Sequence, residues 1–363
     1  MPHKLPCLLE LPPNRVRRNY CGGRVLDALE GKAAPADSDR PENWLCSLTE
    51  AVKPGMEIAP DEGLSRVVAD GRAYVLRELI AEAPEHFLGA EHYKKHGLQT
   101  GFLAKLLDSS MRLHLQAHPT REFARRVLGK PWGKFECYVI LAVRAGIEPY
   151  IYLGFQHPPT PEEWLRIVTE QDMDAMRFCF EKVPVRVGEV WFVPGGLPHA
   201  LGEGLTVLEV LEPSDLVVRC EFEREGVIVP PGARSMGRDP ADALRIFDYT
   251  AWPLDTVQAH FRVAPETLVA TECMKEKRRI GAGQIDCFEV RELEVAAAAK
   301  YDLEGRFALG IVAEGEGWIY CGEEQLALRP GSCFLLAAAA GQVRVEAATG
   351  DALRVLLCLP GAA

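Results

Sequence analysis

The segment from Leu113 to Pro119 constrains the fold of this chain most. Its sequence, Leu-His-Leu-Gln-Ala-His-Pro, alternates apolar and polar residues with a period of two, a pattern typical of a half-buried strand. Successive side chains of a strand point to opposite faces, so we expect Gln116 and His118 on the same face. Two donor groups placed side by side in this way can bind one ion.

Two later segments supply further donors. Residues 133–141 predict a second strand with Glu136 near its start, and residues 192–199 predict a strand and a tight turn that end at His199. Together with the pair on the first strand, they offer two nitrogen and two oxygen ligands. Such a set suits a divalent ion of the zinc type, although Gln is an uncommon zinc ligand. Any one of these residues alone is more often structural, and it is their spacing that favours a metal site.

The spacing also resembles the two sequence signatures of the cupin superfamily. In the second signature a strand and a turn containing Pro and Gly direct a histidine into a barrel, and the segment from Gly188 to His199 has that spacing. Gln116-x-His118 resembles the His-x-His of the first signature, with Gln in place of the first His. The acid normally follows a few residues later, and here a helical insertion precedes it.

Four segments together resemble the type I mannose-6-phosphate isomerases. They occur in the order of that family and at plausible separations: Leu-Leu-Asp-Ser-Ser-Met-Arg-Leu-His-Leu-Gln-Ala-His-Pro (106–119), Gly-Lys-Phe-Glu-Cys (133–137), Val-Pro-Gly-Gly-Leu-Pro-His-Ala (193–200) and Leu-Glu-Val-Leu-Glu-Pro-Ser-Asp-Leu-Val-Val-Arg (208–219). The resemblance is clear over about residues 100–225 and faint at Gly22-Gly23 and at Glu42-Asn43-Trp44.

This resemblance implies a zinc-dependent isomerase that interconverts mannose 6-phosphate and fructose 6-phosphate through an enediol. It implies that one Zn²⁺ per chain is bound by four ligands: Gln116, His118, Glu136 and His199. Three further residues correspond to pocket positions of the family: Arg219, which serves the substrate and its developing charge, Glu209 and Lys134. For Glu209 and Arg219 a surface ion pair is the alternative, since either side chain can face outward from its strand.

The chain also departs from the family pattern. His114 stands where the family commonly has Ser, Phe135 follows Lys134 in place of Pro, and Leu201 replaces a frequent aromatic residue or Ile. None of these changes removes a metal ligand, but several fall on the expected pocket. Two alternatives therefore remain: a metal-binding cupin of other activity, such as a dioxygenase, or a sugar-binding protein without catalysis.

The second half of the chain predicts another series of strands, beginning at Leu268. Eleven residues after Gly331 stands Gln342, where the first half has His199 eleven residues after Gly188, and alanines replace the turn's Pro and Gly. We therefore expect a mainly β (α+β) chain with two cupin-type jelly-roll barrels, of which the second is degenerate and binds no metal. The predicted domains are residues 1–265, with a helical insertion at about 61–107, and residues 266–363.

The composition limits the partners of the chain. A formal net charge of -11 argues against nucleic acid, and no apolar run reaches the roughly 18 residues of a membrane span. The 11 cysteines are odd in number and never spaced Cys-x-x-Cys, and the N-terminal residues do not resemble a signal segment. We expect reduced thiols, a cytoplasmic location and a small-molecule sugar phosphate as the ligand.

Overall fold

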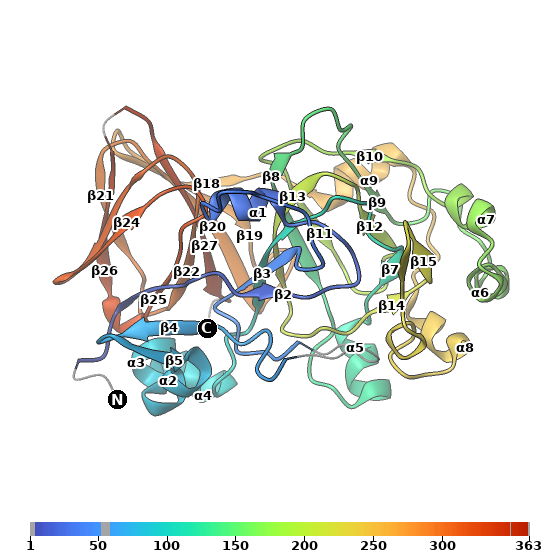
Figure 1. Cartoon of the computed structure of the whole chain (residues 1–363), viewed down its shortest axis with the longest axis horizontal. Coiled ribbons are helices and arrows are strands. Elements are labelled where there is room, and N and C mark those ends of the chain that lie inside the picture. The colour runs from blue at the N-terminus through green and yellow to red at the C-terminus, as the bar shows by residue number, and fades with distance from the viewer. Residues whose placement is uncertain (1–3, 52–58, 349, 362–363) are drawn as a thin grey trace.

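The computed structural model describes residues 4–51, 59–348 and 350–361. Its strands form four large sheets arranged in layers (Figure 1) and two two-stranded hairpins. All pairings between neighbouring strands are antiparallel, as expected for strands that alternate apolar and polar residues. The two outer sheets each cover one seven-stranded sheet, and the two seven-stranded sheets face each other in the middle of the molecule.

The N-terminal half contributes one seven-stranded and one five-stranded sheet. The seven-stranded sheet contains, in spatial order, β17 (Arg262–Val263), β11 (Val190–Val193), β8 (Glu136–Val143), β13 (Leu205–Leu211), β6 (Leu103–Asp108), β3 (Glu42–Leu45) and β2 (Arg15–Val16). The five-stranded sheet contains β10 (Val183–Pro184), β9 (Tyr150–Leu153), β12 (His199–Leu201), β7 (Gln116–Ala117) and β14 (Val218–Arg219).

The C-terminal half repeats this arrangement. Its seven-stranded sheet contains β1 (Leu8–Glu10), β25 (Cys333–Leu336), β22 (Ala308–Glu314), β27 (Leu353–Pro360), β20 (Phe288–Val295), β19 (Met274–Ile280) and β18 (Glu266–Ala270). Its four-stranded sheet contains β21 (Ala298–Asp302), β26 (Gln342–Ala347), β23 (Gly317–Cys321) and β24 (Glu324–Leu328). The first strand of the chain thus belongs to the sheet of the C-terminal half.

Three large apolar clusters lie between the layers, and a further large one lies on an outer face. Residues such as Val139 and Leu208 pack against Val290 and Ile311, which joins the two seven-stranded sheets. A second cluster lies between the two C-terminal sheets, and a third between the two N-terminal sheets. A fourth packs helices onto the outer face of the five-stranded sheet: α6 (Pro161–Glu170), α7 (Met173–Phe178) and α8 (Pro240–Ala243). Burial of these apolar faces stabilises the stack.

The sequence predicted most of these elements, and the chain is mainly β as expected. The strands of the second half are confirmed, and α6 begins with a capping box at Thr160. The expected strand around Leu113 is shorter, since only Gln116 and Ala117 pair as β7. In the described part of the chain the sheets are open and form packed pairs, with no closed barrel among them.

The prediction of helix over about residues 61–107 is wrong for its last residues, which belong to β6, and for its first part. That part contains a hairpin of β4 (Arg66–Ala69) and β5 (Arg72–Val75), and helices follow only as α2 (Leu76–Glu82), α3 (Pro84–Leu88) and α4 (Ala90–His96). The reason lies in the turn: Asp70 and Gly71 have φ of 47° and 70°, as a two-residue hairpin turn requires. Val67, Val68 and Val75 also fit a helical spacing, which predicted a helix, but the Asp-Gly turn folds this segment as a hairpin.

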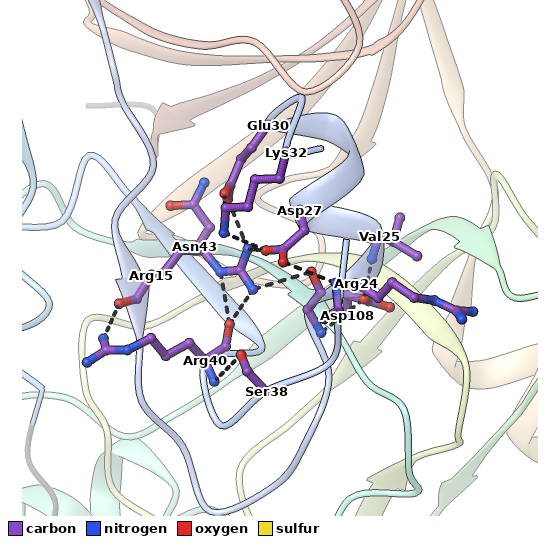
Figure 2. Close-up of polar contacts among 12 residues, drawn as sticks. Arg15, Arg24, Val25, Asp27, Glu30, Lys32, Ser38, Arg40, Asn43 and Asp108 are labelled. Carbon is purple, nitrogen blue, oxygen red and sulfur yellow. Dashed lines mark hydrogen bonds and ion pairs between the residues drawn. The ribbon is translucent and has the colours of Figure 1, made fainter. Parts of the chain in front are cut away.

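Polar contacts hold the N-terminal arm, residues 15–43, against β6. Asp108 accepts hydrogen bonds from the backbone N–H groups of Gly23 and Val25, at 3.0 and 2.8 Å. Figure 2 shows Asp108 beside Val25 at the start of the arm's helix. In the same view Arg15 donates to Asp27 and Glu30, which fixes α1 (Arg24–Leu29) beside β2. This anchoring positions the intervening residues 18–20 at the cavity described below. No helix in the described residues is long and apolar enough to cross a membrane.

Candidate metal centre

Strand pairing brings the predicted ligands together between the two N-terminal sheets. On the five-stranded sheet, β12 pairs with β7 so that His199 lies opposite Gln116, and His118 follows β7 directly. On the facing seven-stranded sheet, Glu136 is the first residue of β8 and lies opposite Val193 of β11. Residues far apart in the sequence therefore meet because their strands are neighbours or face each other.

Three of these residues form a compact buried cluster. The ligand atoms of His118, Glu136 and His199 all lie within 4.8 Å of one another. His118 Nε2 lies 3.1 Å from Glu136 Oε1, and His199 Nε2 lies 3.4 Å from Glu136 Oε2. All three side chains are at most 1% exposed. Buried donors at such separations converge on a space of the size of one ion.

The hydrogen bonds around the cluster show which atoms face inward as lone pairs. His118 Nδ1 bonds the carbonyl oxygen of Leu216 and His199 Nδ1 that of Leu197, both at 2.8 Å. Because a carbonyl only accepts, each Nδ1 carries a hydrogen, and in the neutral form of each ring Nε2 presents a lone pair to the centre. Within the described ranges, Glu136 Oε1 accepts no hydrogen bond of suitable geometry. Two nitrogen lone pairs and a carboxylate that face one another fit a divalent cation.

Lys134 lies beside the same lone pairs. Its ammonium nitrogen is 2.9 Å from Glu136 Oε1 and 3.4 Å from His118 Nε2. Gln116 completes the cluster, with its amide nitrogen 3.5 Å from His199 Nε2. A half-turn of that amide would exchange its nitrogen for its oxygen and present a fourth donor.

The environment favours the protonation states that bind metals. Burial lowers the pKa of His118 to about 3, against the opposing effect of Glu136, so the imidazole is neutral at neutral pH. Burial alone would raise the pKa of Glu136, but the ammonium group of Lys134 opposes this effect, and the pKa lies well below its usual range. A neutral histidine and an ionised carboxylate are the forms that coordinate a metal.

A polar cavity adjoins this cluster and contains all three of the predicted pocket residues. Its lining residues are Arg18, Asn19, Tyr20, Glu42, Lys105, Leu107, Leu113, His114, Gln116, Lys134, Glu209, Val217 and Arg219. Glu209 is buried and pairs with Lys105 at 3.1 Å, so it does not form the surface ion pair considered from the sequence. Burial, with Glu136 nearby, raises the pKa of Glu209 although Lys105 opposes it.

The sequence analysis missed several charged residues of the cavity. Arg18 pairs with Glu42 at 3.0 Å and with Asp215 at 3.1 Å, and Lys105 lies 3.7 Å from Glu42. A signal for Lys105 was available, because a single lysine in the fully buried strand Leu-Ala-Lys-Leu-Leu-Asp requires a partner. For Glu42 the only sequence signal was the faint family resemblance at Glu42-Asn43-Trp44, which did not indicate a cavity residue.

The charges around the cavity balance one another. Four cations of the described residues line the cavity: Arg18, Lys105, Lys134 and Arg219. Four carboxylates line it or pair with these cations: Glu42, Glu136, Glu209 and Asp215. Arg219 donates to the carbonyl oxygen of Ala233 at 2.7 Å and has no carboxylate partner in the described part of the chain. Burial lowers its pKa to about 10, which still leaves it charged at neutral pH. A divalent metal would therefore leave a surplus of two positive charges.

Known proteins with similar sequences point to one family. The family model described as "Mannose-6-phosphate isomerase, cupin domain" matches residues 282–356. The probable mannose-6-phosphate isomerase GmuF of Bacillus subtilis is 26% identical over 257 residues, which are 67% of this chain and 71% of the relative. The mannose-6-phosphate isomerase of Streptococcus mutans is 27% identical over 280 residues, 74% of this chain and 79% of its own length.

Solved structures agree. The mannose 6-phosphate isomerase from Bacillus subtilis superposes with a TM-score of 0.72 at 20% identity, covering 97% of this chain and 99% of that chain. The chain has the fold of the mannose-6-phosphate isomerases. A putative mannosephosphate isomerase from Archaeoglobus fulgidus gives the same TM-score of 0.72 at 19% identity, covering 99% of this chain and 100% of that chain. The resemblance to this family found in the sequence is thereby confirmed.

Proposed function

We propose that this protein is a zinc-dependent aldose–ketose isomerase that interconverts mannose 6-phosphate and fructose 6-phosphate. The observation that carries the proposal is the buried convergence of His118, Glu136 and His199 beside a charge-balanced polar cavity. The two curated relatives described above are mannose-6-phosphate isomerases by name, and one structure of the same fold is described as zinc bound. Gln116 is the fourth proposed ligand of one Zn²⁺ per chain.

The proposed reaction moves a proton between two adjacent carbons of the open-chain sugar. Zinc held by the cluster would supply Lewis-acid polarisation of the substrate oxygens. Glu209 is suited to accept and return a proton, because a carboxylate with a raised pKa is a better base than an exposed one. Arg219 can donate two parallel hydrogen bonds to an oxyanion or a phosphate. Lys134 adds positive charge between the cavity and the cluster.

The charge balance supports a phosphorylated sugar as the substrate. With a divalent ion bound, the surplus of two positive charges matches a phosphate dianion, and an uncharged sugar would leave that surplus uncompensated. We also propose that each half of the chain is one cupin-type jelly roll, residues 1–265 and 266–363. Residues 8–10 are an exception to this division, since they extend a sheet of the second half.

A coupled assay tests the proposal. We expect purified protein to convert mannose 6-phosphate to fructose 6-phosphate, to lose this activity after dialysis against a chelator, and to recover it with Zn²⁺. Metal analysis should give about one zinc per chain. Two other outcomes would favour the alternatives: oxygen consumption with a bound redox metal indicates a dioxygenase, and sugar binding without turnover indicates a non-catalytic protein.

A further inference from the structure

His114 is a buried side chain of the cavity to which the proposed reaction assigns no role. It precedes Gln116 by two residues, which is the spacing of side chains on one face of an extended segment. Its exposed fraction is 3%, and it lines the cavity together with Gln116 and Arg219. Its Nε2 is fully buried and has no hydrogen-bond partner in the described part of the chain.

The ring presents this nitrogen as an acceptor. The main chain of Val227 forms a hydrogen bond with the ring, and since Nε2 has no partner, the bonded atom is Nδ1. A carbonyl accepts from Nδ1–H, so the single hydrogen of the neutral imidazole lies there and Nε2 keeps its lone pair. Buried acceptors in folded proteins are almost always paired, so this atom calls for a donor from outside the chain.

The surroundings of His114 are rigid. Leu115, the next residue, donates its backbone N–H to Glu221 at 2.7 Å, and Arg112 binds the same carboxylate with two guanidinium nitrogens. Leu113 donates its backbone N–H to the carbonyl oxygen of Leu201 at 2.9 Å. The segment therefore holds the imidazole in place before any ligand arrives, as a binding residue requires.

We propose that His114 Nε2 accepts a hydrogen bond from a hydroxyl group of the bound sugar and so determines which end of the ligand lies at this wall. This proposal rests on the proposed function and deepens it. A neutral acceptor binds a hydroxyl donor but not a phosphate dianion, whose oxygens are themselves acceptors. Arg219, the cation of the same cavity without a carboxylate partner, is the group for the anionic part of the ligand. The cavity thus offers different chemistry to the two parts of a sugar phosphate.

Binding of two probes to the zinc-loaded protein tests the assignment. One probe is a hexitol 6-phosphate, which carries sugar-like hydroxyl groups but cannot isomerise. The other is inorganic phosphate, which has no sugar hydroxyl groups. His114→Phe removes the acceptor and keeps a ring, whereas His114→Gln restores an acceptor and serves as the matched control. In calorimetry, His114→Phe should bind the hexitol phosphate about tenfold more weakly than wild type and bind inorganic phosphate with unchanged affinity. His114→Gln should recover part of the lost affinity for the hexitol phosphate.

Each result decides a separate point. If His114→Phe bound both probes more weakly by the same factor, His114 would contact the phosphate. If it bound both as tightly as wild type, a solvent molecule would satisfy the nitrogen. Either result overturns the proposal. A set of hexitol phosphates that each lack one hydroxyl should contain one for which wild type and His114→Phe bind equally. Turnover is measured in parallel: His114-dependent binding without isomerisation would reject the proposed function alone, and wild-type protein that binds no hexitol phosphate would reject both. Zinc content and thermal unfolding of each variant exclude misfolding.

Discussion

The two halves of the molecule differ in the turn that joins two corresponding strands, because only the turn of the N-terminal half ends at a metal-ligand candidate. In the N-terminal half, β11 is followed by Pro-Gly-Gly-Leu-Pro and then by His199, which is buried at the start of β12. In the C-terminal half, β25 is followed by the short 3-10 helix of residues 338–340 and then by Gln342, which is exposed at the start of β26. Both halves keep their strand pairing and apolar core. The sheet framework therefore does not depend on the metal ligands.

Two buried carboxylates make the same contrast. Glu136 faces histidine nitrogens, and among the described residues its Oε1 accepts no hydrogen bond of suitable geometry, although the ammonium of Lys134 lies 2.9 Å away. Glu289, in the C-terminal half, is surrounded by three arginines: Arg278 at 2.7 Å, Arg291 at 3.1 Å and Arg306 at 3.0 Å. Donors of the chain itself saturate the second carboxylate, so it stabilises the fold, whereas the first has capacity left for a metal. The contrast leads to four predictions.

The largest effect is expected for Glu136→Gln. This change removes the charge from the ligand set, so zinc affinity should fall by at least about a hundredfold and activity should fall with it. Metal analysis and the coupled assay measure both. Full zinc occupancy with normal turnover would show that the metal lies elsewhere, and two tightly bound ions in the wild type would show that the C-terminal half is not degenerate.

Arg219→Ala should affect the reaction and spare the metal. If its guanidinium stabilises charge that develops on the substrate, kcat should fall by roughly a hundredfold, with zinc content unchanged. A loss seen chiefly in KM would instead assign Arg219 to the phosphate. Unchanged kinetics would place it outside the site. Glu136→Gln is the matched comparison, because there zinc and activity fall together.

Glu289→Gln should act on stability alone. Burial opposes ionisation of Glu289, but Arg291, Arg278 and Arg306 outweigh it and lower the pKa to about 2 from its ordinary value of 4.5. Because the folded pKa is lowered, its contribution is fully present above about pH 4.5 and is lost as pH falls toward 2. The variant should lose about 3 kcal/mol at neutral pH and show a flatter stability between these values. Zinc content should not change; loss of zinc would mean that the halves are coupled.

The smallest effect is expected for Thr160→Ala, in the helices outside both sheets. Thr160 accepts a hydrogen bond from the backbone N–H of Glu163, whose side chain accepts one from Thr160 N–H. Loss of this cap should cost about 1 kcal/mol in chemical denaturation, with activity and zinc content unchanged. Thr160→Ser retains the hydroxyl and should behave as wild type.

The sequence predicted the parts of the structure that depend on local pattern. Strand β26, for example, alternates polar and apolar residues over Gln-Val-Arg-Val because one face is buried, and this pattern is visible without a structure. The hairpin at Asp70-Gly71 was missed because its valines also recur at helical spacing. The spacing of His118 and His199 indicated a metal site, whereas Arg18 and Lys105 were missed. These two belong to an arm and a strand that reach the cavity only through tertiary pairing.

The position of β1 has a consequence for how the chain is made. Leu8 pairs with Leu336, so β1 is synthesised long before the strand with which it pairs. Contacts at such sequence separation form late, because the ends of a long loop must first meet. The seven-stranded sheet of the C-terminal half is therefore complete only after β25 has paired with β1. A fragment that starts at residue 266 would lack this strand, and its β25 would expose an unpaired edge prone to association.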